Sequence, residues 1–164
     1  MTDPRAWIGL GSNLDDPLGH VERALQELGR LPVTRRLAAS TCYVSRPVGP
    51  ADQPDFVNAV AMVATRLSPL ALLDQLQALE QRHGRVRQRH WGPRTLDLDL
   101  LLFADYRLAW PRLTLPHPEL AHRAFVLLPL AEVTPELRLP DGRSVACLAA
   151  ALEDHGVSPM LPDA

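Results

Sequence analysis

The stretch Trp91-Gly-Pro-Arg-Thr-Leu-Asp-Leu-Asp-Leu-Leu-Leu-Phe103 leads from a turn into an apolar segment that carries two carboxylates. Glycine followed by proline is typical of a turn, and the leucines after it are typical of a buried strand. Side chains two positions apart on a strand point to the same face, so Asp97 and Asp99 are expected about 7 Å apart, with the intervening leucines facing the other way. Two carboxylates in this arrangement predict a cation site. The alternative is a polar strand face open to water.

The length and composition predict one domain over residues 1–164. The chain is 46% hydrophobic and 22% charged, which is ordinary for a globular protein with a full core. No apolar run approaches the roughly 18 residues needed to span a bilayer, and the first residues lack a signal-peptide pattern. We therefore expect a cytoplasmic protein without a membrane partner.

The basic residues exclude some chemistry, because all 17 of them are arginine. Without lysine there can be neither a P-loop lysine nor a Schiff base, so a bound phosphate must be held by arginine, histidine, metal or backbone N–H groups. Five arginines lie between residues 82 and 94, and they predict either a solvated face or a phosphate site. Cys42 and Cys147 lack the spacing of a zinc site or a redox pair.

Local signals predict the order β-α-β-β-α-β. The expected elements are a strand at residues 6–11, a helix from Asp16-Pro17 to about Leu31, two paired strands at 36–44 and 56–65, a helix from Ser68-Pro69 to Gly84, and the strand of the opening stretch. Beyond them we expect a hairpin within 106–115, a helix at 121–133 and a final helix at 144–152. This order fits an α+β, ferredoxin-like βαββαβ sandwich with an additional C-terminal hairpin and helices.

Two segments between the expected elements have features of functional loops. Gly9-x-Gly11 lies between a strand and a helix, but the third glycine of a dinucleotide fingerprint would fall at Leu14, which excludes that site. The loop at 45–55 contains three prolines and is long for a hairpin. It is either a functional loop or a surface connection.

The acidic pair and the arginines that precede it can serve one ligand. Mg²⁺ takes one or two protein carboxylates and completes its octahedron with water and substrate phosphates. Arginines fork onto phosphate oxygens and neutralise the charge that shifts during phosphoryl transfer. The sequence therefore predicts a magnesium and nucleotide site at the start of this strand.

The chain resembles the 6-hydroxymethyl-7,8-dihydropterin pyrophosphokinases of folate biosynthesis over nearly its whole length. The matching stretches are Gly9-Leu-Gly-Ser-Asn-Leu14, Pro47-Val-Gly-Pro-Ala-Asp-Gln-Pro-Asp-Phe-Val-Asn-Ala59, Gly84-Arg-Val-Arg87, Trp91-Gly-Pro-Arg-Thr-Leu-Asp-Leu-Asp99 and Leu115-Pro-His117. The fourth stretch, with its fixed Asp-x-Asp, is the most specific.

The resemblance implies transfer of a diphosphoryl group from ATP to the pterin hydroxymethyl oxygen, with AMP as the other product and two Mg²⁺ ions as cofactors. It implies that Asp97 and Asp99 are the metal ligands and that Arg85 and Arg94 assist the transfer. The residues implied to contact ATP are Gln77, Glu80, Arg87, Arg112, Thr114 and His117. Those implied to contact the pterin are Ser45, Val48, Phe56, Asn58, Trp91 and Phe125.

Several of these residues have simpler interpretations. Phe56 and Phe125 could be core residues, and Asn58 could be a satisfied polar residue of a strand. His117 could be a turn residue, and Glu80 could belong to the polar side of its helix.

The chain departs from the family pattern in two places. The loop from residue 84 to residue 91 is one residue shorter than expected, so no role is carried over to Arg89 or His90. Arg46 stands at a usually uncharged position of the pterin wall. The general base also stays open between Asp97 and a metal-bound water.

Two other functions use similar parts. A metal-dependent nucleotide hydrolase also needs paired carboxylates. A non-catalytic ferredoxin-like module could bind RNA through sheet aromatics, but an aromatic content of 5% and the lack of an RNP-like pattern argue against it. We expect small-molecule substrates, no nucleic-acid partner and a monomer.

Overall fold

The structure, a computed structural model, describes residues 2–45, 54–84 and 95–160. Its strands are β1 (Arg5–Ser12), β2 (Thr34–Ala39), β3 (Tyr43–Ser45), β4 (Phe56–Thr65), β5 (Asp97–Phe103), β6 (Leu108–Ala109), β7 (Thr114–Leu115) and β8 (Val157–Pro159). Its helices are α1 (Pro17–Leu28), α2 (Pro69–Arg82), α3 (Ala124–Val133) and α4 (Val145–Ala150), with a 3₁₀ turn at Leu120–His122.

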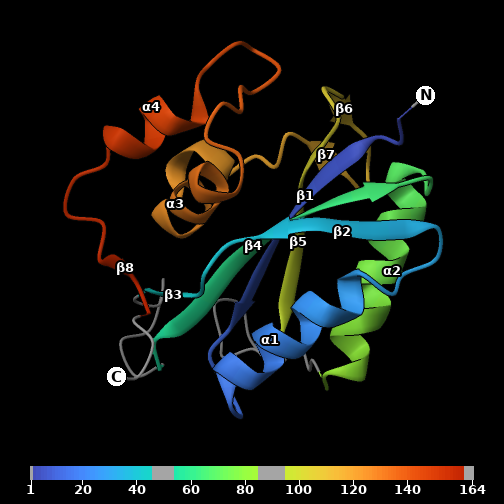
Figure 1. Cartoon of the computed structure of the whole chain (residues 1–164), viewed down its shortest axis with the longest axis horizontal. Helices are drawn as coiled ribbons and strands as arrows, with labels where there is room; N and C mark the ends of the chain where they lie inside the picture. Colours follow the sequence, from blue (N-terminus) through green and yellow to red (C-terminus); the bar gives the residue numbers. More distant parts are fainter. Residues whose placement is uncertain (1, 46–53, 85–94, 161–164) are drawn as a thin grey trace.

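The strands form one large antiparallel sheet and one small hairpin (Figure 1). The large sheet has the order β5-β1-β4-β3-β8, and β2 also pairs with β4. The hairpin consists of β6 and β7. Helices and an antiparallel sheet in one chain confirm the α+β class.

Both long helices begin at the predicted cap residues. The Asp16 carboxylate accepts a hydrogen bond from the Gly19 N–H at 3.3 Å, ahead of Pro17 in the first helical turn of α1. Ser68 Oγ accepts one from the Ala71 N–H at 3.1 Å at the start of α2. Each cap satisfies an N–H group that the helix itself leaves free.

The end of α1 was predicted about three residues too late. The helix ends at Leu28 because Gly29 turns its N–H back onto the carbonyls of Gln26 and Glu27. Leu31 lies beyond the helix, yet it is buried in the same core. The apolar spacing therefore continued past the last helical residue. The end of α2 was predicted correctly, since His83 is its C-cap and Gly84 follows with a φ of 76°.

The sheet has a hydrophobic core on each face. α1 and α2 cover one face, and α3 lies against the other (Figure 1). Alternate residues of β4 divide between the two: Val57 belongs to the first core and Val60 to the second. Trp7 anchors the second core, and its indole N–H donates to Thr134 Oγ1 at 3.0 Å.

A β-bulge interrupts the pairing of β1 with β5. Ile8 pairs with Leu100 but Trp7 pairs with Leu102, so Leu101 is an extra residue. Leu101 and Leu102 therefore both pack into the second core, although they are consecutive.

The single strand predicted at residues 36–44 is wrong in detail. It is two strands, β2 and β3, separated at Ser40. The Ser40 hydroxyl accepts a hydrogen bond from the Val60 N–H at 3.0 Å, and the Ser40 N–H donates to the Val60 carbonyl at 2.8 Å. A side chain thus replaces part of the backbone ladder at the break.

The C-terminal part matches the prediction more loosely. The hairpin is present, but the helix predicted at 121–133 is a 3₁₀ turn and α3, separated by an extended Arg123. The helix predicted at 144–152 is the shorter α4, which Ser144 caps. β8 was not predicted. Within the described residues, no helix has both the length and the apolar character required to cross a membrane.

Candidate active site

The acidic pair lies at the start of β5, an edge strand of the sheet. Asp97 and Asp99 are both partly exposed, and the leucines between and beside them belong to the core under α1 and α2. The structure therefore directs the two carboxylates toward the face that also carries α3. Their pairing partners on β1 are Gly11 and Gly9.

The two glycines let neighbouring side chains approach the backbone of β1 closely. A Cβ added at Gly11 would lie 3.1 Å from Asn58 Nδ2 and 3.8 Å from a Phe56 ring carbon. A Cβ at Gly9 would meet the Leu101 side chain at 3.4 Å. Between the carboxylates of β5 and the side chains of β4, the glycines therefore leave room for Leu101, Asn58 and Phe56 to lie close to the backbone of β1.

A polar and aromatic wall stands on the other side of the glycines. Asn58 pairs with Gly11 across β1 and β4, and the neighbouring Phe56 pairs with Ser45 of β3. The Ser45 hydroxyl donates to Asn58 Oδ1 at 2.5 Å, and both residues are buried. This bond fixes the Asn58 carboxamide with its NH₂ group on the side of Gly11.

His117 reaches the acidic pair from the segment after the hairpin. Its N–H donates to the Leu101 carbonyl at 2.9 Å, so the extra residue of the bulge anchors it. Its Nδ1 accepts from the Glu119 N–H at 3.1 Å, and its Nε2 lies 4.0 Å from Asp99 Oδ1. The neutral ring therefore carries its proton on Nε2, the nitrogen nearer Asp99.

The charge state of His117 follows from its surroundings. Burial, the largest influence, lowers the pKa of the imidazole, and the Arg123 guanidinium lowers it further. Glu119 and Asp97 act in the opposite direction but do not compensate. The ring is thus a neutral hydrogen-bond donor at pH 7.

Arg123 was not singled out from the sequence. Besides acting on His117, its guanidinium carbon lies 5.5 Å from the centre of the Phe125 ring at the start of α3. It is the extended residue between the 3₁₀ turn and α3. The sequence showed an arginine two residues before Phe125, and this proximity could have identified Arg123 as a candidate site residue.

The predicted nucleotide contacts are divided in space. Arg112 donates to Asp74 Oδ1 at 2.5 Å and to Gln77 Oε1 at 3.3 Å, so the hairpin is tied to the exposed side of α2. Thr114 lies on β7 and is exposed. Glu80, in contrast, is only 4% exposed, and its Oε2 accepts the Leu98 N–H at 2.8 Å.

Five predicted site residues lie outside the described residues. They are Val48, Arg85, Arg87, Trp91 and Arg94. The same holds for Arg46, Arg89 and His90.

A further polar network ties α3 to β3. The Tyr43 hydroxyl donates to Glu132 Oε1 at 2.6 Å, and the Thr41 N–H donates to Glu132 Oε2 at 2.8 Å. Burial and the bond to Glu132 raise the pKa of Tyr43 to about 12. Burial alone would raise the pKa of Glu132, but the bonds from Tyr43 and Thr41 outweigh it and the pKa is lowered.

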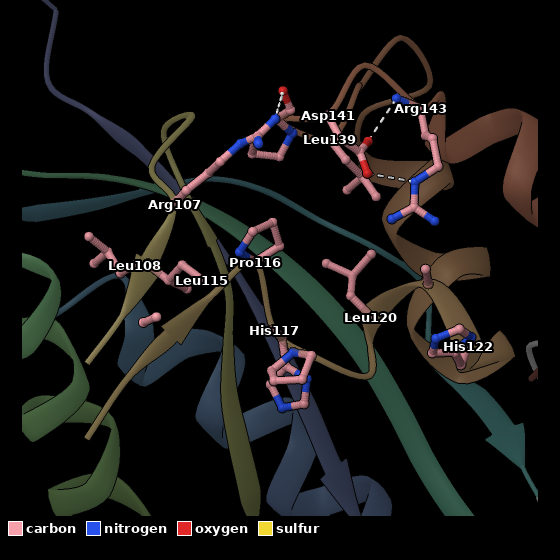
Figure 2. A pocket seen from close by; sticks show the side chains of 14 residues that line it. Arg107, Leu108, Leu115, Pro116, His117, Leu120, His122, Leu139, Asp141 and Arg143 are labelled. Carbon is pink, nitrogen blue, oxygen red and sulfur yellow. Dashed lines mark hydrogen bonds and ion pairs between the residues drawn. The ribbon is translucent and has the colours of Figure 1, made fainter. Parts of the chain in front are cut away.

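A pocket of about 450 Å³ adjoins His117 (Figure 2). It lies between the hairpin, the segment from Pro116 to His122, and the turn around Asp141. Arg107 crosses its rim to donate to the Pro140 carbonyl at 2.8 Å. His117 is the one predicted site residue in its lining, so the pocket borders the acidic pair without containing it.

Asp97 and Asp99 are the described residues that could hold a metal ion together with substrate oxygens. Within the described ranges, no three His, Cys, Asp or Glu side chains come together as a metal cage. Two carboxylates on an open face match a Mg²⁺ ion that keeps most of its ligands as water and substrate oxygen.

Comparisons with known proteins agree on one family. The sequence profile of 7,8-dihydro-6-hydroxymethylpterin-pyrophosphokinase (HPPK) matches residues 7–135. A 2-amino-4-hydroxy-6-hydroxymethyldihydropteridine pyrophosphokinase of Pseudomonas aeruginosa is 54% identical over 93% of this chain and 94% of its own. The protein of that name from Haemophilus influenzae is 45% identical over 96% of this chain and 98% of its own.

Solved structures show a similar fold at low sequence identity. A crystal structure of Plasmodium falciparum HPPK-DHPS with pteroate has a TM-score of 0.71 at 15% identity and covers 90% of this chain. An HPPK-DHPS in complex with substrates has a TM-score of 0.72 at 13% identity and covers 92%. The present chain spans only 42% and 43% of those two chains.

Proposed function

Because this chain belongs to the 7,8-dihydro-6-hydroxymethylpterin-pyrophosphokinase family, we propose that it transfers a diphosphoryl group from ATP to 6-hydroxymethyl-7,8-dihydropterin in folate biosynthesis. The pterin hydroxymethyl oxygen would form a bond to the β-phosphorus while the bond from the β-phosphorus to the α,β-bridging oxygen breaks. AMP leaves, and the hydroxyl proton passes to a base. One observation carries the proposal: the carboxylates of β5 and the Phe56–Asn58 wall of β4 lie on either side of the two glycines of β1.

Asp97 and Asp99 are proposed to hold two Mg²⁺ ions together with the triphosphate. Bound Mg²⁺ would neutralise phosphate charge and align the β-phosphorus with the attacking oxygen. The proposal is supported by two partly exposed carboxylates on one strand face. Arg85 and Arg94 are proposed to guide and stabilise the transferred group, in keeping with a chain in which arginine is the only strong side-chain cation.

The nucleotide is proposed to lie along β5 toward the hairpin. Gln77 and Arg112 are tied together there, and Thr114 and Arg87 complete the proposed contacts. His117 suits a phosphate contact because its Nε2–H is a neutral donor beside Asp99. A neutral imidazole has one N–H group, and that group can donate a hydrogen bond to a phosphate oxygen.

The pterin is proposed to lie between Phe56 and Phe125, since a flat heteroaromatic ring favours stacking on aromatic faces. Asn58, oriented by Ser45, offers the NH₂ donor of its carboxamide toward Gly11. Trp91 and the main chain at Val48 are proposed to close the site. The oxygen of Asn58 accepts one hydrogen bond from Ser45 and has a second acceptor site, so the carboxamide can offer the ring edge a donor and an acceptor.

The finer topology is proposed to be ferredoxin-like. The order β5-β1-β4 with β2 and β3 beyond β4, all antiparallel, is the arrangement expected when βαββαβ closes into one sheet. Residues 1–164 are proposed to work as one monomeric domain in the cytoplasm. The pairing of β8 with β3 supports the single domain, because it joins the end of the chain to the central sheet.

The identity of the nucleotide product tests the function. The purified protein, ATP, Mg²⁺ and 6-hydroxymethyl-7,8-dihydropterin should yield AMP and the pterin diphosphate in equal amounts. Formation of ADP would contradict diphosphoryl transfer. Phosphate release without the pterin would instead support a nucleotide hydrolase. RNA binding through the sheet is disfavoured, since helices cover both faces.

A further inference from the structure

The outer edge of β5 is closed by a side chain. Within the described sheet, β5 pairs only with β1, so its outward N–H and C=O groups need other partners. Glu80 provides one: it lies in the last turns of α2, and its Oε2 accepts the Leu98 N–H at 2.8 Å in a buried position.

The bonded residue lies between the two carboxylates. Backbone N–H groups alternate in direction along a strand, so if the Leu98 N–H points outward, those of Asp97 and Asp99 point to β1. Their partners there are Gly11 and Gly9. The Asp-x-Asp segment is thus held on its inner side by β1 and on its outer side by Glu80.

α2 can hold Glu80 firmly. Leu76 and Leu79, on the same helix, are fully buried in the core under the sheet. Glu80 as a whole is 4% exposed, so its side chain is supported by packing and does not move freely in solvent. A ligand pair keeps its spacing only when the backbone that carries it is held in this manner.

We propose that Glu80 is a positioning residue for the metal site: it fixes the backbone of β5 so that the two aspartates present their carboxylates at the spacing that a divalent cation requires. The proposal rests on the proposed function of Asp97 and Asp99. It replaces a direct contact of Glu80 with ATP by an action through Leu98.

The test compares three variants with the wild type. Glu80→Met keeps the length and helix preference of the side chain but removes the acceptor. Glu80→Gln retains an acceptor oxygen. Leu79→Ala, one residue earlier, removes buried volume from the same helix and is the control for lost stability alone.

Two readouts address the position of β5. Amide hydrogen exchange at Leu98 should accelerate in Glu80→Met beyond the change at other β5 amides, and Glu80→Gln should restore protection. The affinity for Mn²⁺, measured by its paramagnetic resonance signal with a non-hydrolysable ATP analogue, should weaken about tenfold or more in Glu80→Met, as for lost supporting contacts in metal sites. Leu79→Ala should lower the melting temperature but keep the Mn²⁺ affinity.

The outcomes separate this proposal from the proposed function. Unchanged Mn²⁺ affinity in Glu80→Met, with accelerated exchange at Leu98, would reduce Glu80 to a structural role and overturn the proposal. Weaker binding of the nucleotide analogue measured without any metal would show a direct contact and also overturn it. If the wild type forms no AMP, the proposed function fails, but the exchange and Mn²⁺ measurements still decide the role of Glu80.

Discussion

At the scale of single residues, hydrogen bonds from neighbouring groups orient the side chains of the site. The Glu119 N–H determines which nitrogen of His117 carries the proton, and the Ser45 hydroxyl holds the Asn58 carboxamide with its NH₂ group toward Gly11. The candidate ligands could be predicted from residue type and spacing, whereas these orienting bonds depend on the folded backbone.

Replacing either aspartate should remove activity and leave the fold. Asp97→Ala or Asp99→Ala should lower the rate of AMP formation by about a thousandfold, because several kcal/mol of charge stabilisation is lost. Removing one of two like charges should not destabilise the free protein. Enzyme assays and melting curves measure the two effects. The control is Asp105→Ala, which replaces an exposed residue just beyond β5. A much lower melting temperature of the Asp97→Ala variant would indicate a structural role instead.

His117 should make the protein more sensitive to acid. The pKa of His117 in the folded protein is below the ordinary 6.5. Between the two pKa values, the imidazole is therefore protonated in the unfolded chain and neutral in the folded protein. Its stabilising effect is therefore present above pH 6.5 and is lost as the pH falls through 6.5 toward the lower folded pKa. Urea unfolding at about pH 7.5 and about pH 5.5 should show a larger loss for the wild type than for His117→Gln.

His20 also has a lowered pKa, through burial first and then His83 and Arg23, but it is present in both proteins and cancels in that comparison. Equal losses of stability in the wild type and His117→Gln would contradict the assignment of a neutral His117.

At the scale of elements, β1 separates the two halves of the site. Its glycines were visible in the sequence as Gly9-x-Gly11, and Leu14 excluded a dinucleotide fingerprint there, but the sequence did not indicate what the two glycines do instead. Only the pairing with Asp97 on one side and Asn58 on the other identifies their role. A glycine inside a strand often marks a place where another group lies close to the backbone, and the strand pairing shows which side chains are nearby.

A methyl group at Gly11 should therefore impair one substrate selectively. Gly11→Ala would press on Asn58, so the KM for the pterin should rise about tenfold, a usual effect of one misplaced methyl group. The KM for ATP should change much less. Gly9→Ala is the matched control because its methyl group meets Leu101 and not Asn58. Steady-state kinetics with each substrate varied in turn measure the two KM values. Equal changes in the pterin KM of Gly11→Ala and Gly9→Ala would contradict the placement of the pterin beside Asn58.

At the scale of the whole molecule, the sequence predicted what is locally encoded. The cap-and-proline signals at Asp16 and Ser68 placed both helix starts. The division of β2 from β3 at Ser40, the strand β8 and the burial of Glu80 depend on partners distant in the chain. A polar residue near a helix end reads as exposed until the strand beside it is known.

Removal of β8 tests how far the chain end supports the site. Val157 of β8 pairs with Ser45 and is buried. A chain that ends at Asp154 should melt about 5 °C lower than the full chain. Its affinity for the pterin should fall more than its affinity for ATP. A chain that ends at Met160 keeps β8 and is the control. Equal melting temperatures in the two truncated chains would show that β8 adds nothing to stability.

The bulge at Leu101 also separates the two aspartates of β5 from the residues that pair with the start of β1. Before it, Asp97 and Asp99 face the site while Leu98 and Leu100 lie in the core under α1 and α2. From the bulge on, Leu101 and Leu102 pack into the core against α3, and the register with β1 shifts by one residue. Protein engineers could therefore exchange Asp97 and Asp99 for a different ligand pair without repacking Leu101 and Leu102. The same division lets an evolving sequence alter the chemistry while conserving the scaffold.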